Sequence, residues 1–185
     1  EWMPVTFLKN NQGVFQNVTS LSGIQSQTGW WNSLAPGDFD NDGDMDYIAG
    51  NLGANSFYKA SEKYPVSITS ADFDKNGSYD ALLSVFLPES AVQPERQEYT
   101  VHLRDDFISQ LPGTRKLLPD YHSFATANFD QLLSGFGKID NLVRLTANYF
   151  QSSIVLNDGN GKFTIRPLPV QALLSVVNGS ISLSL

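Results

Sequence analysis

The chain has no cysteine, only two histidines and few basic residues. The lack of cysteine excludes disulfide bonds, thiolate catalysis and cysteine-type zinc sites. Lysine and arginine number 12 against 19 aspartate and glutamate residues, so the net charge is −7. Because phosphates are bound by clustered lysine and arginine, this balance argues against a nucleic-acid partner. We also find no signal peptide and no apolar run near the roughly 20 residues that a membrane span needs, and we expect no transmembrane segment.

What remains is the composition of a folded globular protein. The 185 residues are long enough for one substantial domain with a real core. A hydrophobic fraction of 41% favours a folded chain over a disordered one.

Two nine-residue segments are unusually rich in side-chain oxygens, namely Asp38–Asp46 and Asp72–Asp80. In each, oxygen-bearing residues stand at alternate positions, with glycine at the sixth position and aspartate at the ninth. Such crowding of like charge is expected where a cation relieves it. Calcium suits best, since it accepts six to eight oxygens at about 2.3–2.6 Å and tolerates irregular geometry. We therefore expect two Ca²⁺ sites, the second weaker because Asn76 and Ser78 replace acids.

Two other interpretations of these segments stay open. An EF-hand shares the beginning of the pattern, but its loop closes with glutamate at position twelve between two helices. That position holds Ala49 in the first segment and Leu83 in the second, and strand-like residues follow both. The segments could also be solvated acidic turns without an ion.

The rest of the chain is a series of short expected strands. A hairpin pattern around an Asn/Gly turn at residues 7–19 recurs at 154–165. Such recurrence is typical of a repeat architecture. Between residues 104 and 137 the apolar period becomes helical, which predicts a helical insertion. We expect repeats with the two calcium loops at 1–103, the insertion at 104–137, and a further repeat at 138–185, ending in a truncated repeat or an apolar edge strand at 180–185.

These features resemble the FG-GAP/VCBS repeats of β-propellers, including the integrin α-subunit propeller. The layout is similar to that of large secreted FG-GAP-like proteins of Bacteroidetes type. The resemblance rests on the acidic loops, their run-in and the two Asn/Gly hairpins. It implies an all-β fold of about three propeller-type blades, within a larger propeller or a homo-oligomer. It also implies calcium ligands: in the first loop the side chains of Asp38, Asp40, Asp42 and Asp46 with the carbonyl of Asp44, and in the second Asp72, Asp74, Asn76 and Asp80 with the carbonyl of Ser78.

No catalytic motif is found, and no catalytic residue is assigned. The carboxylates of Glu95, Glu98, Asp105 and Asp106 could in principle form a pair for glycoside hydrolysis, but a solvated turn and a helix cap are the expected roles. Trp30 and Trp31 are the ligand candidates, because neighbours on an extended strand point to opposite faces and one should be accessible.

The sequence therefore predicts a calcium-binding module with a structural, adhesive or ligand-recognition role. We expect an exported protein, whether extracellular, periplasmic or at the cell surface, with a protein or glycan partner. The alternative is a calcium-dependent polysaccharide lyase or hydrolase on a propeller scaffold.

Overall fold

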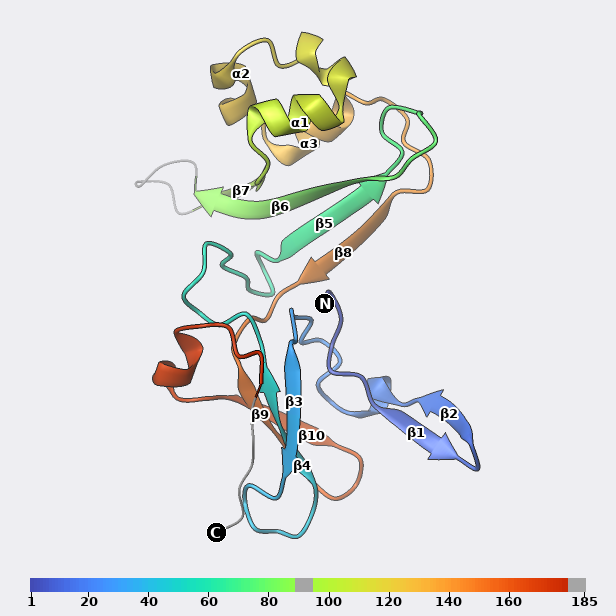
Figure 1. Ribbon diagram of the computed structural model, residues 1–185, viewed down its shortest axis with the longest axis vertical. Coiled ribbons are helices and arrows are strands. Elements are labelled where there is room, and N and C mark those ends of the chain that lie inside the picture. Colours follow the sequence, from blue (N-terminus) through green and yellow to red (C-terminus); the bar gives the residue numbers. More distant parts are fainter. Residues whose placement is uncertain (89–94, 180–185) are drawn as a thin grey trace. The chain divides into compact units, whose positions relative to one another are not determined.

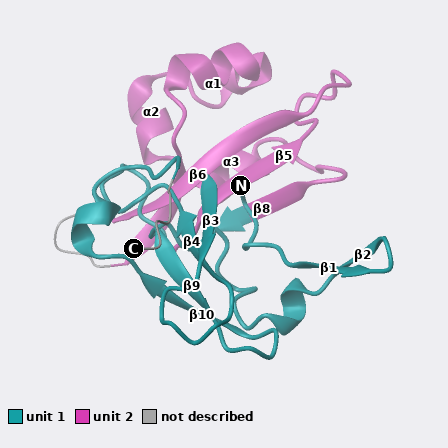
Figure 2. Cartoon of the chain, turned by 60° about the horizontal axis from the view of Figure 1, so that its bottom comes forward, with its two compact units in different colours: residues 1–63, 146–185 teal, residues 64–145 magenta. Residues whose placement is uncertain are grey.

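The computed structural model describes residues 1–88 and 95–179. They form two compact units (Figures 1 and 2). Each unit has its own hydrophobic core. Unit 1 contains Glu1–Lys63 and Thr146–Leu185, and unit 2 contains Tyr64–Leu145. Unit 1 is thus assembled from both ends of the sequence. The strand or truncated repeat expected at 180–185 lies outside the described residues.

Unit 1 is built on a four-stranded antiparallel sheet in the order β10-β9-β4-β3. The sheet joins two hairpins edge to edge, and Tyr47 of β4 pairs with Val155 of β9. The whole of unit 2 separates these hairpins in the sequence. The strands are β3 (Ser33–Gly37), β4 (Asp46–Gly50), β9 (Ser153–Asn157) and β10 (Phe163–Pro167).

A separate hairpin precedes this sheet in unit 1. It consists of β1 (Leu8–Asn11) and β2 (Val14–Asn17), and the 3₁₀ turn η1 (Thr19–Leu21) follows it. Every residue of both strands is exposed. At its base, the ring of Phe7 stacks on Phe163 at 4.1 Å between centroids, which anchors the hairpin to the core of unit 1.

Unit 2 contains the other four-stranded sheet, in the order β7-β6-β5-β8. The helical segment lies on one face of this sheet (Figure 1) and buries Phe107, Leu111, Phe129 and Leu132 against Leu82. The strands are β5 (Val66–Ala71), β6 (Asp80–Pro88), β7 (Arg96–Thr100) and β8 (Val143–Ala147); the helices are α1 (Arg104–Gln110), η2 (Pro112–Lys116), α2 (Tyr121–Thr126) and α3 (Phe129–Ser134), with η3 (Val170–Leu173) in unit 1.

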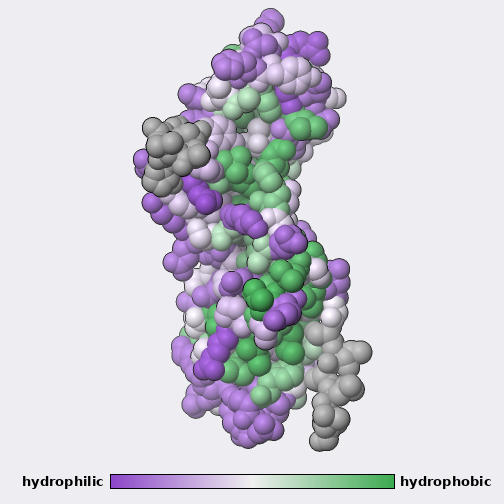
Figure 3. All heavy atoms as spheres, turned by 90° about the vertical axis from the view of Figure 1, so that its left-hand side faces the viewer, coloured by the Kyte–Doolittle hydropathy of each residue, from purple (hydrophilic) through white to green (hydrophobic). Residues whose placement is uncertain are grey.

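The expected fold class is confirmed: the described residues are mostly β, with three sheets and a small helical insertion between β7 and β8. None of the helices in the described part of the chain has both the length and the apolar content to cross a bilayer. Large apolar side chains remain at the surface, and Figure 3 shows hydrophobic residues on the face it draws of both units.

Helix α3 depends on its N-terminal cap. The side chain of Asn128 accepts a hydrogen bond from Gln131 N–H at 2.9 Å, and the Gln131 side chain accepts from Asn128 N–H at 2.9 Å. Asn128→Ala removes the first of these bonds and is expected to lower the free energy of unfolding by about 1 kcal/mol. Asn128→Ser, which keeps a capping oxygen, should recover most of the loss in urea titrations. Equal losses in both variants would contradict a capping role.

Candidate metal centre

The two acidic loops occupy equivalent places in the two units. The first joins β3 to β4 and the second joins β5 to β6, both pairs being antiparallel. The register is also the same, since Gly37 pairs with Asp46 and Ala71 with Asp80. Because strands flank both loops, the EF-hand interpretation, which needs flanking helices, does not fit.

The backbone of the two loops turns at matching positions. The fourth residue has a positive φ of 61° in both, at Asn41 and Lys75. The sixth residue also has a positive φ, 92° at Gly43 and 91° at Gly77. Glycine adopts this conformation without steric cost, which accounts for its place in the pattern.

Amide donors inside each loop point at its first carboxylate. Gly43 N–H donates to Asp38 Oδ2 at 3.1 Å, and Gly77 N–H donates to Asp72 Oδ2 at 2.9 Å. The turn therefore holds the first and sixth residues together in both loops.

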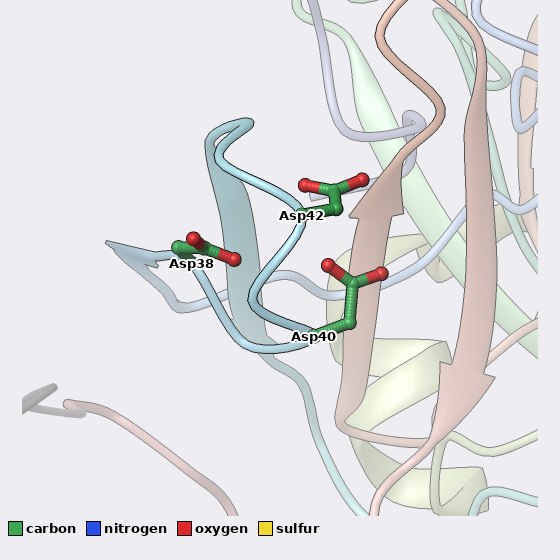
Figure 4. Close-up of side chains that lie close together, drawn as sticks. All are labelled: Asp38, Asp40 and Asp42. Atoms are coloured by element: carbon green, nitrogen blue, oxygen red, sulfur yellow. The ribbon is translucent and has the colours of Figure 1, made fainter.

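Three carboxylates of the first loop come together at the surface. Asp38, Asp40 and Asp42 are exposed, and each offers an oxygen within 4.8 Å of the others (Figure 4). Two ligands of one calcium ion, each at about 2.3–2.6 Å, lie at most about 5 Å apart. The oxygens of Asp38, Asp40 and Asp42, three of the five predicted ligands of the first loop, thus lie close enough together to contact one hard cation.

The electrostatic environment of these carboxylates also favours a bound cation. The pKa of Asp40 is raised above its ordinary value, first because surrounding protein atoms displace water, and then because Asp42 and Asp46 carry like charge. Like charges at short range disfavour the ionised form, and a bound cation would reverse that effect.

Asp46, at the ninth position, has a structural role that the sequence does not reveal. Its side chain is buried, and its two oxygens accept hydrogen bonds from Phe39 N–H and Asn157 N–H, both at 2.8 Å. One donor belongs to the loop and the other to the end of β9. Asp46 therefore ties the acidic loop to the β9–β10 hairpin.

Asp44 lies at the same junction. It is half-buried, and its N–H donates to Asp42 Oδ1 at 2.8 Å. A Cβ at Gly159 would lie 2.6 Å from Asp44 Oδ2, and Gly159 has a φ of +77°. The positive φ therefore favours glycine at position 159, and a side chain there would also displace the carboxylate of Asp44.

In the second loop, the predicted ligands Asp72, Asp74 and Asn76 share one turn. Asn76 N–H donates to Asp72 Oδ1 at 2.9 Å and to Asp74 Oδ1 at 3.2 Å. The Asn76 side chain accepts from Ser78 N–H at 2.7 Å, as Asp42 accepts from Asp44 in the first loop. The residue types differ between the loops, but two hydrogen bonds recur, from the sixth residue to the first side chain and from the seventh residue to the fifth side chain.

Asp80, the ninth residue of the second loop, differs from Asp46. It is 9% exposed, and its Oδ1 accepts from Gln110 Nε2 at 3.1 Å. Its Oδ2 is buried, and no hydrogen-bond partner is found for it among the described residues. A buried carboxylate oxygen normally has a partner, so this atom is available to a cation or a water molecule.

The ligand candidates Trp30 and Trp31 are half-buried and pack in two separate aromatic groups of unit 1. Trp31 stacks on Tyr149 at 5.9 Å between centroids. Trp30 contacts the rings of Trp2, Tyr58 and Phe150 at centroid distances of 5.1, 4.9 and 5.0 Å. The side chains of Trp30 and Trp31 therefore point in different directions, as expected for neighbouring residues of an extended segment.

Two of the carboxylates weighed for hydrolysis make structural contacts. Glu98 Oε1 accepts from Arg144 Nη2 and from Ser84 Oγ, both at 2.6 Å. Asp105 Oδ2 accepts from the hydroxyl of Tyr121 at 2.8 Å.

Comparison with protein families gives a match to part of the chain. Residues 3–49 match the FG-GAP-like repeat, a span that includes the β1–β2 hairpin, the first acidic loop and nearly all of β4. The second loop lies outside that span. Comparison with curated proteins and with solved structures found no match. Residues 3–49 are therefore similar to the FG-GAP-like repeat expected from the sequence, and such repeats are of β-propeller type.

Proposed function

We propose that the chain is a calcium-binding structural or ligand-recognition module, in which calcium rigidifies both acidic loops. The observation that carries the proposal is the equivalence of the two loops. They share the spacing of oxygen-bearing residues, the register of the flanking strands and the two positive φ angles. A solvated acidic turn that binds no ion does not require this spacing, this register and these φ angles together.

The residues that would hold the first ion are the carboxylates of Asp38, Asp40, Asp42 and Asp46 with the Asp44 carbonyl; the second set is Asp72, Asp74, Asn76 and Asp80 with the Ser78 carbonyl. When bound, calcium supplies positive charge that favours the ionised carboxylates and links their oxygens. The chain itself supplies the turn. Positive φ angles at the fourth and sixth positions form the turn on which these oxygens are placed.

The consequence for the fold is local order between strands. In unit 1, Asp46 already joins the loop to Asn157 at the end of β9. Fixing the loop would therefore fix the junction between the two hairpins of the sheet. A rigid surface of this kind suits recognition of a protein or glycan, or packing within a larger propeller.

The proposal includes export from the cytoplasm. Extracellular modules bind calcium with dissociation constants of about 10⁻⁴–10⁻³ M, which an external calcium concentration can saturate. The absence of cysteine and the net charge of −7 are compatible with that location.

Thermal unfolding with calcium and with chelator tests the proposal. Calcium at 100 times its Kd stabilises a protein by about 2.7 kcal/mol, so chelation should lower the Tm by several degrees. Asp40→Ala should remove most of the calcium effect that arises in the first loop. Glu62→Ala, which removes an exposed carboxylate outside both loops, is the matched control and should keep the full effect. Identical melting curves in calcium and chelator for the unmodified chain would refute the proposal.

A further inference from the structure

The second acidic loop places one apolar side chain in the core of unit 2. Phe73 stands between two predicted ligands, Asp72 and Asp74, and is only 4% exposed. Its ring lies 5.0 Å from that of Phe136, which follows α3, measured between centroids. It also belongs to the buried cluster that contains Phe107 of α1. The backbone that carries two predicted ligands therefore packs against the helical insertion.

The equivalent phenylalanine of the first loop, Phe39, packs differently. It is half-buried, and its ring lies over its own strand, since a Cβ added at Gly37 would be 2.8 Å from Phe39 Cζ. The residue equivalent to Gly37 in the second loop is Ala71. The methyl group of Ala71 leaves no room for a ring in that position. Phe73 therefore takes another position, in the core with the helices.

A hydrogen bond also links the second loop to α1. Asp80, the ninth residue of the loop, accepts through Oδ1 from Gln110 Nε2 at 3.1 Å. Asp80 is 9% exposed, and its Oδ2 is buried without a hydrogen-bond partner in the part of the chain that the structure describes. Metal-binding carboxylates are commonly oriented by such a hydrogen bond from a neighbouring residue. With Oδ1 occupied by Gln110, the oxygen that remains for an ion is Oδ2.

Given the function proposed above, we propose that Gln110 is a positioning residue of the second calcium site, and that calcium bound there stabilises the helical insertion. Gln110 holds Asp80 so that Oδ2 serves the ion. The ion in turn holds the loop that places Phe73 in the core. Linkage makes the two effects reciprocal: order in the insertion raises the calcium affinity, and calcium lowers the population of the opened insertion. Both effects need an ion in the second loop and therefore rest on the proposed function.

The two loops then act on different elements. The ninth residue of the first loop, Asp46, accepts from Asn157 N–H at the end of β9, whereas Asp80 accepts from Gln110 of α1. The second site is expected to be the weaker one. The insertion therefore responds to calcium at concentrations at which the first loop is already filled.

Amide hydrogen exchange, followed by NMR in the full chain, tests the effect of calcium on the insertion. The N–H groups of Phe107, Leu111 and Leu132 donate to backbone carbonyls and report on α1 and α3. Calcium at ten times the Kd of the second site should slow their exchange about tenfold relative to chelator, because the opened insertion loses that site. Asp40→Ala removes the stronger site and should keep this slowing. Asp74→Ala removes the weaker site and should abolish it.

Isothermal titration of calcium into Gln110→Met tests the positioning role. Methionine keeps the length of the side chain but has no N–H to donate. It should weaken calcium binding at the second site about tenfold, the lower end of the usual effect of losing such a contact, and leave the first site unchanged. Ser109→Ala, on the same helix and exposed, is the control and should change neither site.

The outcomes separate this proposal from the proposed function. Calcium bound at both loops, together with unchanged exchange at Phe107, Leu111 and Leu132, would overturn the link to the insertion and leave the proposed function intact. Exchange slowed equally in Asp74→Ala would assign the effect to the first loop and would also overturn it. An unchanged second-site Kd in Gln110→Met would overturn the positioning role. A folded chain that binds no calcium would overturn both proposals.

Discussion

Asp46→Ala is expected to lower the free energy of unfolding by about 4 kcal/mol, even in the absence of calcium. The buried carboxylate accepts hydrogen bonds from Phe39 N–H and Asn157 N–H. Truncation leaves both donors without a partner, and each unsatisfied buried group costs about 1–3 kcal/mol. Urea titration of the chelated protein measures the loss.

The control for Asp46 comes from the same loop. Asp42 is one of the predicted calcium ligands but is exposed, so Asp42→Ala should change the stability of the chelated protein far less. In calcium, both variants should lose stabilisation by the ion. If Asp46→Ala matches Asp42→Ala under chelation, the carboxylate of Asp46 does not hold the two hairpins together.

Phe107→Ala is expected to destabilise unit 2 by about 3–5 kcal/mol, the usual cost of truncating a buried aromatic side chain. Phe107 is fully buried between α1 and the sheet. Its ring lies 5.6 Å from that of Phe124 and 6.3 Å from that of His102, measured between centroids. The truncation would thus leave a cavity at the centre of the helical insertion.

Phe15→Ala is the matched control, since the same atoms are removed from a side chain that is 65% exposed. It should change the stability of the unmodified chain only slightly. Near-equal losses for the two variants would show that the insertion does not pack on the sheet through Phe107. Fluorescence and far-UV circular dichroism against urea give both values.

The parts of the fold that local patterns encode could be predicted from the sequence. The acidic spacing and the glycine at the sixth position identify both loops, because they reflect contacts within nine residues. The two Asn/Gly hairpins are local for the same reason, and both form. The change of apolar period at residue 104 likewise marks the helices that follow β7.

Long-range pairing could not be predicted in this way. β4 and β9 are neighbours in one sheet although unit 2 lies between them in the chain. The bond from Asn157 N–H to Asp46 spans 111 positions. The sequence predicts that Asp46 is a calcium ligand, but nothing near it shows that the same carboxylate also joins two hairpins. The one available signal is the repeated Asn/Gly turn, whose first asparagine is Asn157.

The second loop also makes a contact that could not be predicted from its own sequence. Its asparagine and serine predict weaker calcium binding, while two of its hydrogen bonds recur from the first loop. The donor to Asp80 Oδ1 is Gln110 in α1, 30 positions along the chain, so the sequence near Asp80 does not reveal this contact.

Isothermal titration of calcium into the chelator-treated full chain tests the central claim most directly. Two binding events per chain are predicted, the stronger abolished by alanine at Asp40 and the weaker by alanine at Asp74. An absence of calcium binding at millimolar concentrations, in a chain that circular dichroism shows to be folded, would contradict the account.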